Sequence, residues 1–356
     1  MLFLLLGSLS YERRGWTMKA NLILFAAIGL IVVCGAFVPN SAIADPKTGF
    51  VEVEKLTITI ITDNYYDGVR PEAAIGKRYR PTVEKSIHAE HGLSFFVETE
   101  SGGQTSSFML DFGVDPRGVM RNMELLGVNL QKVDAMGLSH GHWDHWGALE
   151  GILAANRGKI PSGTPFYVGD DAFLERASVR PGSTQPTYLG KLNKAAVEAS
   201  GLRISEVKEP TAVMKGGYFT GGIVRVTDYE KAPTNLLVKK GDKLEADHFR
   251  GEQALFFIVK GKGLVILVGC AHPGIVNTVS HVQKVTGVKK VHAVIGGFHL
   301  VGAKPEIIQR TIADLKADKP DYVIPAHCTG FEALEAFHKE MPKQFILNTA
   351  GTSYTF

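Results

Sequence analysis

The hydrophobic pattern of the first half alternates short strands with amphipathic helices. Runs rich in β-branched and aromatic residues predict strands at residues 56–62, 93–99, 106–112 and 133–138. The second and third strands would form a hairpin around Ser101-Gly102-Gly103. Periodicity and composition predict helices at residues 119–126 and 147–155. The pattern therefore favours a mixed α/β domain.

The second half repeats one order of strand, polar cluster and helix. Strands are predicted at residues 254–259, 264–268, 291–295 and 322–325, and helices at residues 275–285 and 305–317. The last three strands end beside His272, His299 and His327, as the strand at 133–138 ends beside His140. Because sheets place their sites at the carboxyl ends of strands, we expect these four histidines to converge along one edge.

The weakest pattern lies between the two halves, in residues 156–250. A helix is expected at 189–199, and short strands are expected at 223–226 and 236–238. Some side chains here are candidates for substrate contact, with packing anchors as the alternative for the aromatic ones: Tyr218, Phe219, Arg225 and Tyr229.

The first 44 residues have the pattern of a secretory signal peptide. Lys19 precedes an apolar run at 22–38, and an A-x-A site ends at Ala44. We expect translation to start at Met18, with residues 1–17 as an upstream extension. Cleavage after Ala44 would release a periplasmic or secreted chain.

Three weaker interpretations of this segment remain. They are a twin-arginine signal at Arg13-Arg14, a membrane anchor at 22–38 and a lipoprotein attached through Cys34. Gly29 and Gly35 interrupt the apolar run, and Val33 is too large for a lipoprotein cleavage site. We therefore expect no stable membrane anchor after cleavage.

Composition and charge narrow the class of partner. The 356 residues are 45% hydrophobic and 21% charged, which suits a globular protein with a substantial core. Removing residues 1–44 lowers the formal net charge from +3 to about +1. Without a Lys/Arg-rich block, the chain offers no nucleic-acid footprint, and a small-molecule substrate is expected.

The densest chemistry lies in the motif LSHGHWDHWG at residues 138–147. It holds three histidines and a carboxylate within six residues: His140, His142, Asp144 and His145. Neutral imidazole is the commonest metal ligand, and carboxylate oxygens bind the same divalent ions. His140 and His142 can converge on one ion, while Asp144 and His145 can face a second. The alternative is a capping aspartate among surface histidines.

This H-x-H-x-D-H pattern resembles the signature of the metallo-β-lactamase-fold hydrolases. Other blocks resemble the branch labelled dihydropterin-type or methanopterin-pathway phosphate synthases, and they recur from Lys55 to the C-terminus: residues 90–95, 220–223, 226–230, 269–277, 296–300 and 325–330. The resemblance implies a four-layer αββα sandwich formed by a single domain at 45–356. It also implies that residues 156–250 roof the active site.

The resemblance further implies a dinuclear ligand set with one more His, a bridging Asp and a last His. His327 fits the last position, but Cys270 stands where the bridging Asp is expected. We assign His272 as a ligand, with Cys270 as the alternative, and His248 lies near the place of the remaining His. Asp111 would orient the ligands from behind, with a turn-forming role as the alternative.

Asp144 and His299 are the expected catalytic residues. Asp144 would orient water, whereas His299 would act as an acid or oxyanion donor, replace a missing ligand, or simply fill a Gly-rich turn. His88 and His91 are further candidates at the mouth of the pocket. Cys270 and Cys328 adjoin ligand histidines, either as free thiols or as a disulfide.

These features predict an exported metal-dependent hydrolase of a small ester, phosphoester, lactone or amide. One or two divalent ions are expected, with zinc favoured over iron or manganese. One alternative is the pterin-phosphate synthase reaction that the branch label implies, although pterin cofactor assembly belongs in the cytoplasm. The other is a non-catalytic metal- or ligand-binding protein, because the bridging Asp is missing.

Overall fold

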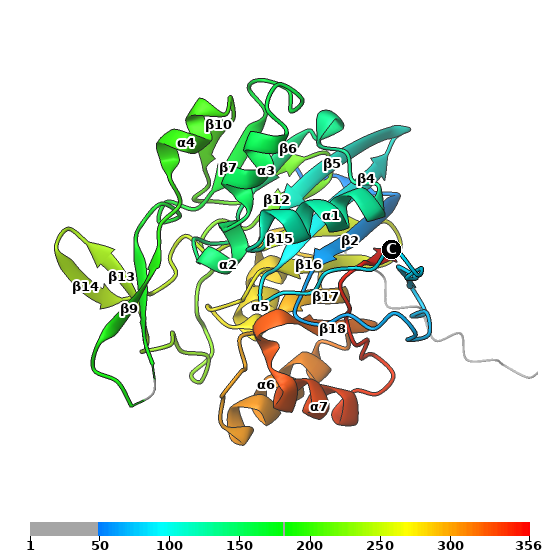
Figure 1. Cartoon of the computed structure of the whole chain (residues 1–356). Coiled ribbons are helices and arrows are strands. Elements are labelled where there is room, and N and C mark those ends of the chain that lie inside the picture. The colour runs from blue at the N-terminus through cyan, green and yellow to red at the C-terminus, as the bar shows by residue number, and fades with distance from the viewer. Residues whose placement is uncertain (1–48, 181) are drawn as a thin grey trace, which may run out of the picture. The chain divides into compact units, whose positions relative to one another are not determined.

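A computed structural model describes residues 49–180 and 182–356 (Figure 1). The signal peptide expected at residues 1–44, with its alternatives, lies outside this range and stays a prediction. Within the described ranges, no helix combines the length and apolar character that crossing a membrane requires.

Two large sheets and a small third sheet form the framework. The first sheet consists, in spatial order, of β10 (Arg203–Glu206), β7 (Pro165–Val168), β6 (Ala135–Gly137), β5 (Gln104–Leu110), β4 (Ser94–Ser101), β2 (Lys55–Thr62), β19 (Thr352–Thr355) and β3 (Gly76–Arg78). The second consists of β11 (Thr211–Met214), β12 (Gly217–Phe219), β15 (Leu255–Val259), β16 (Gly263–Val268), β17 (Val291–Gly297) and β18 (Tyr322–Ala326), with β1 (Glu52–Val53) paired to β15. The third consists of β14 (Lys243–Ala246), β13 (Leu236–Lys240), β8 (Arg176–Val179) and β9 (Pro186–Gly190).

The helices connect these strands. They are α1 (Pro116–Leu126), α2 (Trp143–Trp146), α3 (Leu149–Ala155), α4 (Lys194–Ala199), α5 (Ile275–Thr286), α6 (Pro305–Ala317) and α7 (Phe331–Glu340), with 3₁₀ turns η1 (Leu130–Lys132) and η2 (His327–Thr329). Residues 156–250 supply the whole third sheet and also β7, β10, β11 and β12 of the two large sheets.

The two large sheets pack face to face, and strand β15 shows how. Its odd-numbered residues, such as Phe257, point into the core between the sheets with Phe95 of β4. Its even-numbered residues, such as Phe256, pack on the other face under α5 and α6. Because both faces are covered, the strand is apolar throughout instead of alternating with polar residues. Helices α1 and α3 cover the outer face of the first sheet in the same way. The αββα sandwich is therefore confirmed.

Helix α1 illustrates how local sequence sets the element bounds. Asp115 caps its N-terminus by accepting a hydrogen bond from the backbone N–H of Arg117, and Pro116 occupies the first turn. Gly127 ends the helix with a φ of 72°, a conformation that glycine adopts without strain. These caps extend the helix beyond the predicted start at residue 119.

Two predictions in the middle region are wrong. The predicted helix at 189–199 starts only at Lys194, because Asn193 caps it and Leu189 belongs to strand β9. The predicted strand at 223–226 is a loop, in which the Asn277 side chain accepts hydrogen bonds from the N–H groups of Val226 and Thr227 at 2.7 and 2.8 Å. Val226 is 68% exposed, and its β-branched side chain does not belong to a strand here.

The packing between the sheets can be tested by truncating a core ring. Phe257→Ala should lower the free energy of unfolding by about 3–5 kcal/mol, since it leaves a cavity between two rigid sheets. The matched control is Val226→Ala at an exposed position, which should change stability by less than about 0.5 kcal/mol. Urea denaturation of both variants checks this, and equal small effects would contradict the interlayer position of Phe257.

Candidate metal centre

The motif residues form a buried turn at the carboxyl end of β6. His140 and His142 lie on the loop after the strand, and Asp144 and His145 lie on α2. All four side chains are at most 7% exposed. The His140 ring centroid lies 4.7 Å from that of His142 and 4.2 Å from that of His145. The structure thus brings the predicted motif ligands together.

His272 joins the motif from the end of β16. Its ring centroid lies 4.9 Å from that of His140 and 4.8 Å from that of His142, and the ligand atoms of the three histidines lie within 4.8 Å of one another. The buried Nε2 atoms of His140 and His272 have no hydrogen-bond partner among the described residues. An unpaired buried polar atom costs about 1–3 kcal/mol. A divalent cation would satisfy both nitrogens, so these three residues fit a metal.

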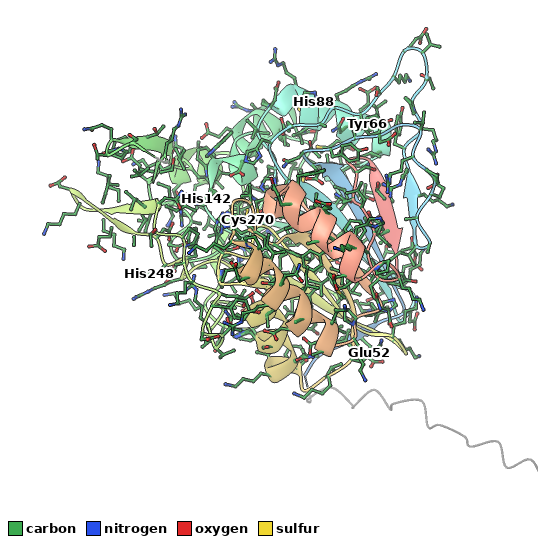
Figure 2. All side chains as sticks on the ribbon, turned by 90° about the horizontal axis from the view of Figure 1, so that it is seen from below. Glu52, Tyr66, His88, His142, His248 and Cys270 are labelled. Carbon is green, nitrogen blue, oxygen red and sulfur yellow. The ribbon has the colours of Figure 1, made fainter. Side chains whose placement is uncertain are left out.

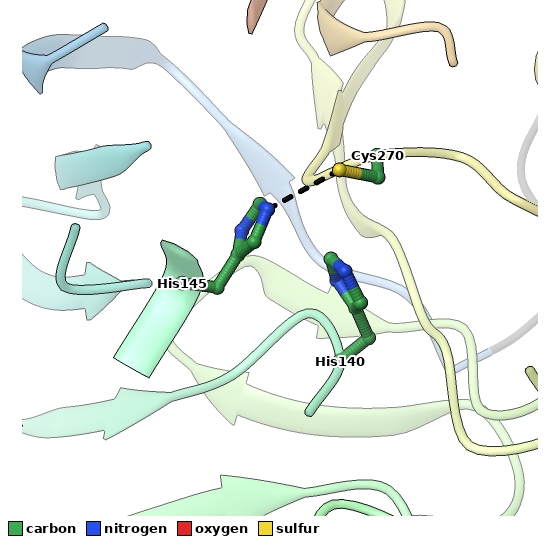
Figure 3. A group of neighbouring side chains, drawn as sticks. All are labelled: His140, His145 and Cys270. Atoms are coloured by element: carbon green, nitrogen blue, oxygen red, sulfur yellow. Dashed lines mark hydrogen bonds between the residues drawn. The ribbon is translucent and has the colours of Figure 1, made fainter. Parts of the chain in front are cut away.

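A second group of ligand atoms adjoins the first (Figure 3). The Cys270 sulfur lies 3.2 Å from His145 Nε2, and both lie within 4.8 Å of a His140 nitrogen. On the neighbouring side, His327 Nε2 lies 3.1 Å from Asp144 Oδ2. The donors therefore include imidazole nitrogen, carboxylate oxygen and thiol sulfur, all of which zinc accepts.

One carboxylate orients two of the motif histidines. Asp111 Oδ2 accepts a hydrogen bond from His145 Nδ1 at 2.7 Å and another from the Ser139 hydroxyl at 2.7 Å. The Ser139 oxygen in turn lies 2.9 Å from His140 Nδ1. With both Nδ1 atoms used in this way, the Nε2 atoms are left to bind a ligand. Asp111 therefore has the geometry of the supporting aspartate.

Glu252 orients His272 in the same manner, and sequence reasoning missed it. Its Oε2 lies 2.7 Å from His272 Nδ1, and its Oε1 accepts the backbone N–H of His272 at 3.1 Å. The Phe249 ring stacks on His272 with a centroid separation of 3.9 Å. Burial raises the pKa of Glu252 to about 8. No local motif marks Glu252, because the partner it contacts lies 20 residues away.

Burial and neighbouring charges keep His140, His142 and His272 in the neutral form. Burial lowers the pKa values of His140, His142 and His272 well below the usual range, and neighbouring imidazoles lower those of His140 and His272 further. Neutral imidazole is the form that coordinates a metal. Burial opposes ionisation of Asp144, but the nearby His145 and His327 outweigh it and lower its pKa.

A buried arginine ties the third sheet to the motif loop. Arg176 of β8 is 1% exposed and pairs with Asp247 at 2.8 Å and with Asp171 at 3.1 Å. Its Nη1 donates to the carbonyl oxygen of Gly141 at 3.3 Å. A Cβ on Gly141 would overlap this guanidinium, which explains why glycine lies between the first two motif histidines. Sequence reasoning also missed this network, whose members are far apart in the chain.

The backbone is strained where the site is built. Non-glycine residues with a left-handed φ include Asp111, Ala271, His299 and His327, with values of 57°, 51°, 46° and 50°. Such conformations cost about 1–3 kcal/mol each and concentrate at functional sites. Packing of the strand ends holds these residues in place.

The remaining predicted histidines fall into two groups. His299 and His91 line the cleft: the His299 ring centroid lies 4.2 Å from that of His272, and His91 Nε2 lies 3.5 Å from Asp144 Oδ2. Burial lowers the pKa of His299 to about 4. His88 and His248 are exposed and absent from the cleft lining (Figure 2). The possible role of His248 as a ligand is thereby contradicted.

The other candidates serve packing. Tyr218 and Phe219 are buried in the sheet cores, and the Tyr229 hydroxyl donates to Asp314 at 2.7 Å. Arg225 donates to the backbone oxygens of His248 and His272. The packing alternative therefore describes the three aromatic candidates, and Arg225 braces loops instead of lining the cleft.

Both cysteines of the described chain are free and buried, so the disulfide alternative is wrong. The Cys328 sulfur lies 3.7 Å from the backbone oxygen of Cys270. Burial is the main cause that raises the pKa of the Cys270 thiol. Both sulfurs thus lie beside the ligand cluster without being joined.

The cluster opens into a cleft of about 410 Å³, a size suited to a small ligand. Its lining combines the metal-binding candidates with residues of the third sheet and of the loops: Asn64, His91, His142, Trp143, Asp144, Ser178, Leu189, Leu236, Cys270, His272, His299, Val301, His327, Cys328 and Gly330.

A four-layer αββα sandwich with converging histidines at one sheet edge defines a class of metal-binding proteins that are mostly hydrolases. The chain belongs to the metallo-beta-lactamase superfamily, whose family model matches residues 89–164. It is 35% identical over 271 residues to a Methanocaldococcus jannaschii protein named 7,8-dihydropterin-6-methyl-4-(beta-D-ribofuranosyl)-aminobenzene-5'-phosphate synthase, covering 75% of this chain and 90% of that relative.

Two further proteins are similar to this chain. An uncharacterized protein of the same organism is 28% identical over 258 residues, covering 71% of this chain and 89% of the relative. The crystal structure of a metal-dependent hydrolase of the beta-lactamase superfamily aligns with a TM-score of 0.65 and 23% identity, over 84% of this chain and 98% of its own. The fold expected from the sequence is thus shared with a solved structure.

The support that Glu252 gives to His272 can be tested through metal affinity. Glu252→Gln should weaken metal binding about 10–100-fold, because the amide orients and polarises the imidazole less well than a carboxylate does. The control is Glu245→Gln on β14, which is exposed and outside the cleft lining. Competition with a chromogenic chelator measures both affinities, and an unchanged affinity in Glu252→Gln would remove this role.

Proposed function

We propose that the mature chain is an exported metal-dependent hydrolase of a small ester, phosphoester, lactone or amide. One observation carries the proposal: the Nε2 atoms of His140 and His272 are buried, have no hydrogen-bond partner among the described residues and are grouped with a nitrogen of His142, and both His142 and His272 line the cleft. Structural metal sites are usually closed, whereas catalytic sites keep one position open to substrate. An open cleft therefore favours catalysis over a structural role.

Zinc is the proposed cofactor, with iron or manganese as alternatives. His140, His142 and His272 would hold the first ion, and a second ion would draw on the adjoining ligand groups, which pair His145 with Cys270 and Asp144 with His327. A thiol among imidazoles and a carboxylate suits a borderline-soft ion such as zinc better than a hard ion. When bound, such an ion supplies Lewis acidity, polarising the substrate oxygen and lowering the pKa of water.

The residues of the chain supply positioning and proton handling. Asp144 is held ionised by its histidine neighbours, so its carboxylate would accept a hydrogen bond from water and orient it. His299 is neutral at physiological pH, because burial lowers its pKa to about 4. Its ring N–H would donate to the charge that develops on the substrate oxygen.

The synthase named for the methanogen relative is the second candidate function. The 35% identity over 90% of that relative favours it. The predicted export signal argues against it, since pterin cofactor assembly belongs in the cytoplasm. A third candidate is a non-catalytic metal-binding protein, favoured by Cys270 at the position expected for the bridging Asp. Metal-dependent turnover and location in the cell separate the three.

The catalytic proposal is tested with metal analysis and three substrate types. The purified mature chain should contain one or two equivalents of zinc and should hydrolyse a phosphodiester, a lactone or a β-lactam. Both His142→Ala and Asp144→Ala should lower turnover by about 10²–10⁴-fold, because they remove a ligand and a water-orienting group. His248→Ala, at an exposed position outside the cleft, is the matched control. Unchanged metal content and activity in both site variants would refute the assignment.

The export proposal has its own experiment. Expression of the chain from Met18 should give a periplasmic or secreted product whose N-terminal residue is Asp45. Cell fractionation and N-terminal sequencing measure this directly. Replacing the apolar residues Ile31, Val32 and Val33 with Asp should retain the product in the cytoplasm with an uncleaved N-terminus. An uncleaved cytoplasmic product of the unaltered chain would favour the synthase candidate instead.

A further inference from the structure

An apolar pocket of about 650 Å³ adjoins the metal cleft at His327. Its walls come from four places in the chain: the segment after β2, the end of β18, α7 and the segment before β19. The lining includes Tyr65, Arg70, His327, Phe331, Leu334 and Phe345. None of these residues was assigned to substrate binding from the sequence, and only His327 belongs to the proposed ligand set.

The pocket and the metal cleft share part of their walls. Asn64, His327 and Gly330 line both. Asn64 Nδ2 donates to the backbone oxygen of His327 at 3.0 Å, and Asn64 Oδ1 lies 3.3 Å from His327 Nδ1. These contacts fix the ring that divides the two spaces. The apolar pocket and the metal cleft therefore lie on either side of His327.

The lining chemistry favours an aromatic group. Tyr65, Phe331 and Phe345 provide rings, and Leu334 and Leu347 provide aliphatic contacts. The Phe331 side chain is 75% exposed and that of Tyr65 is 41% exposed, although both are large and apolar. Aromatic side chains gain most from burial against another flat ring. A bound aryl group would cover surface that now faces solvent.

A cation in the lining adds a preference for negative charge. Arg70 is half-buried, and among the described residues no carboxylate lies within ion-pair distance of its guanidinium, while Asp67 interacts with it from further away. The two acids of the lining do not neutralise it: Asp63 is buried and accepts hydrogen bonds from His327 and Asn348, and Glu335 is exposed on α7. Arginine binds carboxylate, sulfonate or phosphate oxygens through its planar donors.

We propose that this pocket binds the aryl portion of the substrate and that Arg70 pairs with an anionic substituent on it. The proposal rests on the proposed function in one respect only, that the bond to be broken lies in the metal cleft. It narrows the substrate class to compounds that join an anionic aryl group of naphthalene size to a hydrolysable linkage. Cavities of this volume hold ligands of that size.

The test uses 2-naphthalenesulfonate as the probe and the metal-loaded mature chain, with calorimetry as the readout. Leu334→Trp fills the pocket and should weaken binding by at least about tenfold, the equivalent of 1.4 kcal/mol. Arg70→Gln should weaken it about two- to fivefold, as expected for a partly exposed ion pair. Phe331→Ala alters an exposed side chain, so it keeps the test decisive if Leu334→Trp does not fold.

The matched control is Arg203→Gln, which removes an exposed arginine from β10 outside both cavities. It should leave the affinity for 2-naphthalenesulfonate unchanged. If the three pocket variants bind 2-naphthalenesulfonate with the affinity of the unaltered chain, or if the unaltered chain does not bind it, the proposed aryl pocket is wrong.

A second measurement separates this inference from the proposed function. Hydrolysis of methyl phosphate and 2-naphthyl phosphate is compared in the unaltered chain and in Phe331→Ala. If turnover depends on metal but 2-naphthyl phosphate is not preferred over methyl phosphate, the proposed aryl pocket is wrong and the proposed hydrolase function stands. If the pocket variants weaken binding of 2-naphthalenesulfonate but no ester is hydrolysed, the proposed aryl pocket is supported and the proposed hydrolase function is wrong.

Discussion

The hydrogen bonds that fix the Nδ1 atoms of the buried histidines are the interaction on which the site depends. Asp111 holds His145 directly and His140 through Ser139, while Glu252 holds His272. Without these partners the imidazole rings would rotate toward other hydrogen-bond partners. The free-energy cost of burying several imidazoles would then no longer be offset by hydrogen bonds. The unpaired Nε2 atoms are thus a consequence of the carboxylates behind them, which leave one nitrogen of each ring for a cation.

The sandwich explains how residues from distant segments reach one point. Strands β16, β17 and β18 run parallel, so Cys270, His299 and His327 follow strand ends on the same edge of one sheet. Strand β6 of the opposite sheet delivers the motif loop to that edge, and the core between the sheets fixes the separation of the two groups. The left-handed φ values at His299 and His327 persist because tightly packed strand ends leave these residues little freedom.

Apolar runs and residue spacing predicted a mixed α/β domain, the motif ligands and the convergence of strand-end histidines, and the family resemblance implied the four-layer sandwich. Apart from Asp111, whose role the resemblance implied, the supporting residues had no such pattern. Asn64 contacts His327 across 263 positions, and Arg176 contacts Gly141 across 35, so neither contact leaves a periodic trace. The errors at 189–199 and 223–226 have the opposite cause, since helix formers and β-branched residues there suggested elements that tertiary contacts override. His248 also lies near a ligand position expected from the resemblance, but the residue is exposed to solvent.

The third sheet combines a base that is tied to the motif loop with residues that line the cleft, and this division bears on specificity. Its base is pinned to the motif loop by Arg176, which two carboxylates neutralise inside the protein. Breaking one partner of such a buried pair costs about 3–5 kcal/mol, so the sheet cannot shift freely relative to the metal-binding candidates. Above the base, Ser178, Leu189 and Leu236 line the cleft but hold none of the proposed ligands. Substitutions at these positions can therefore change the shape offered to substrate while Asp111 and Glu252 keep the histidines in place.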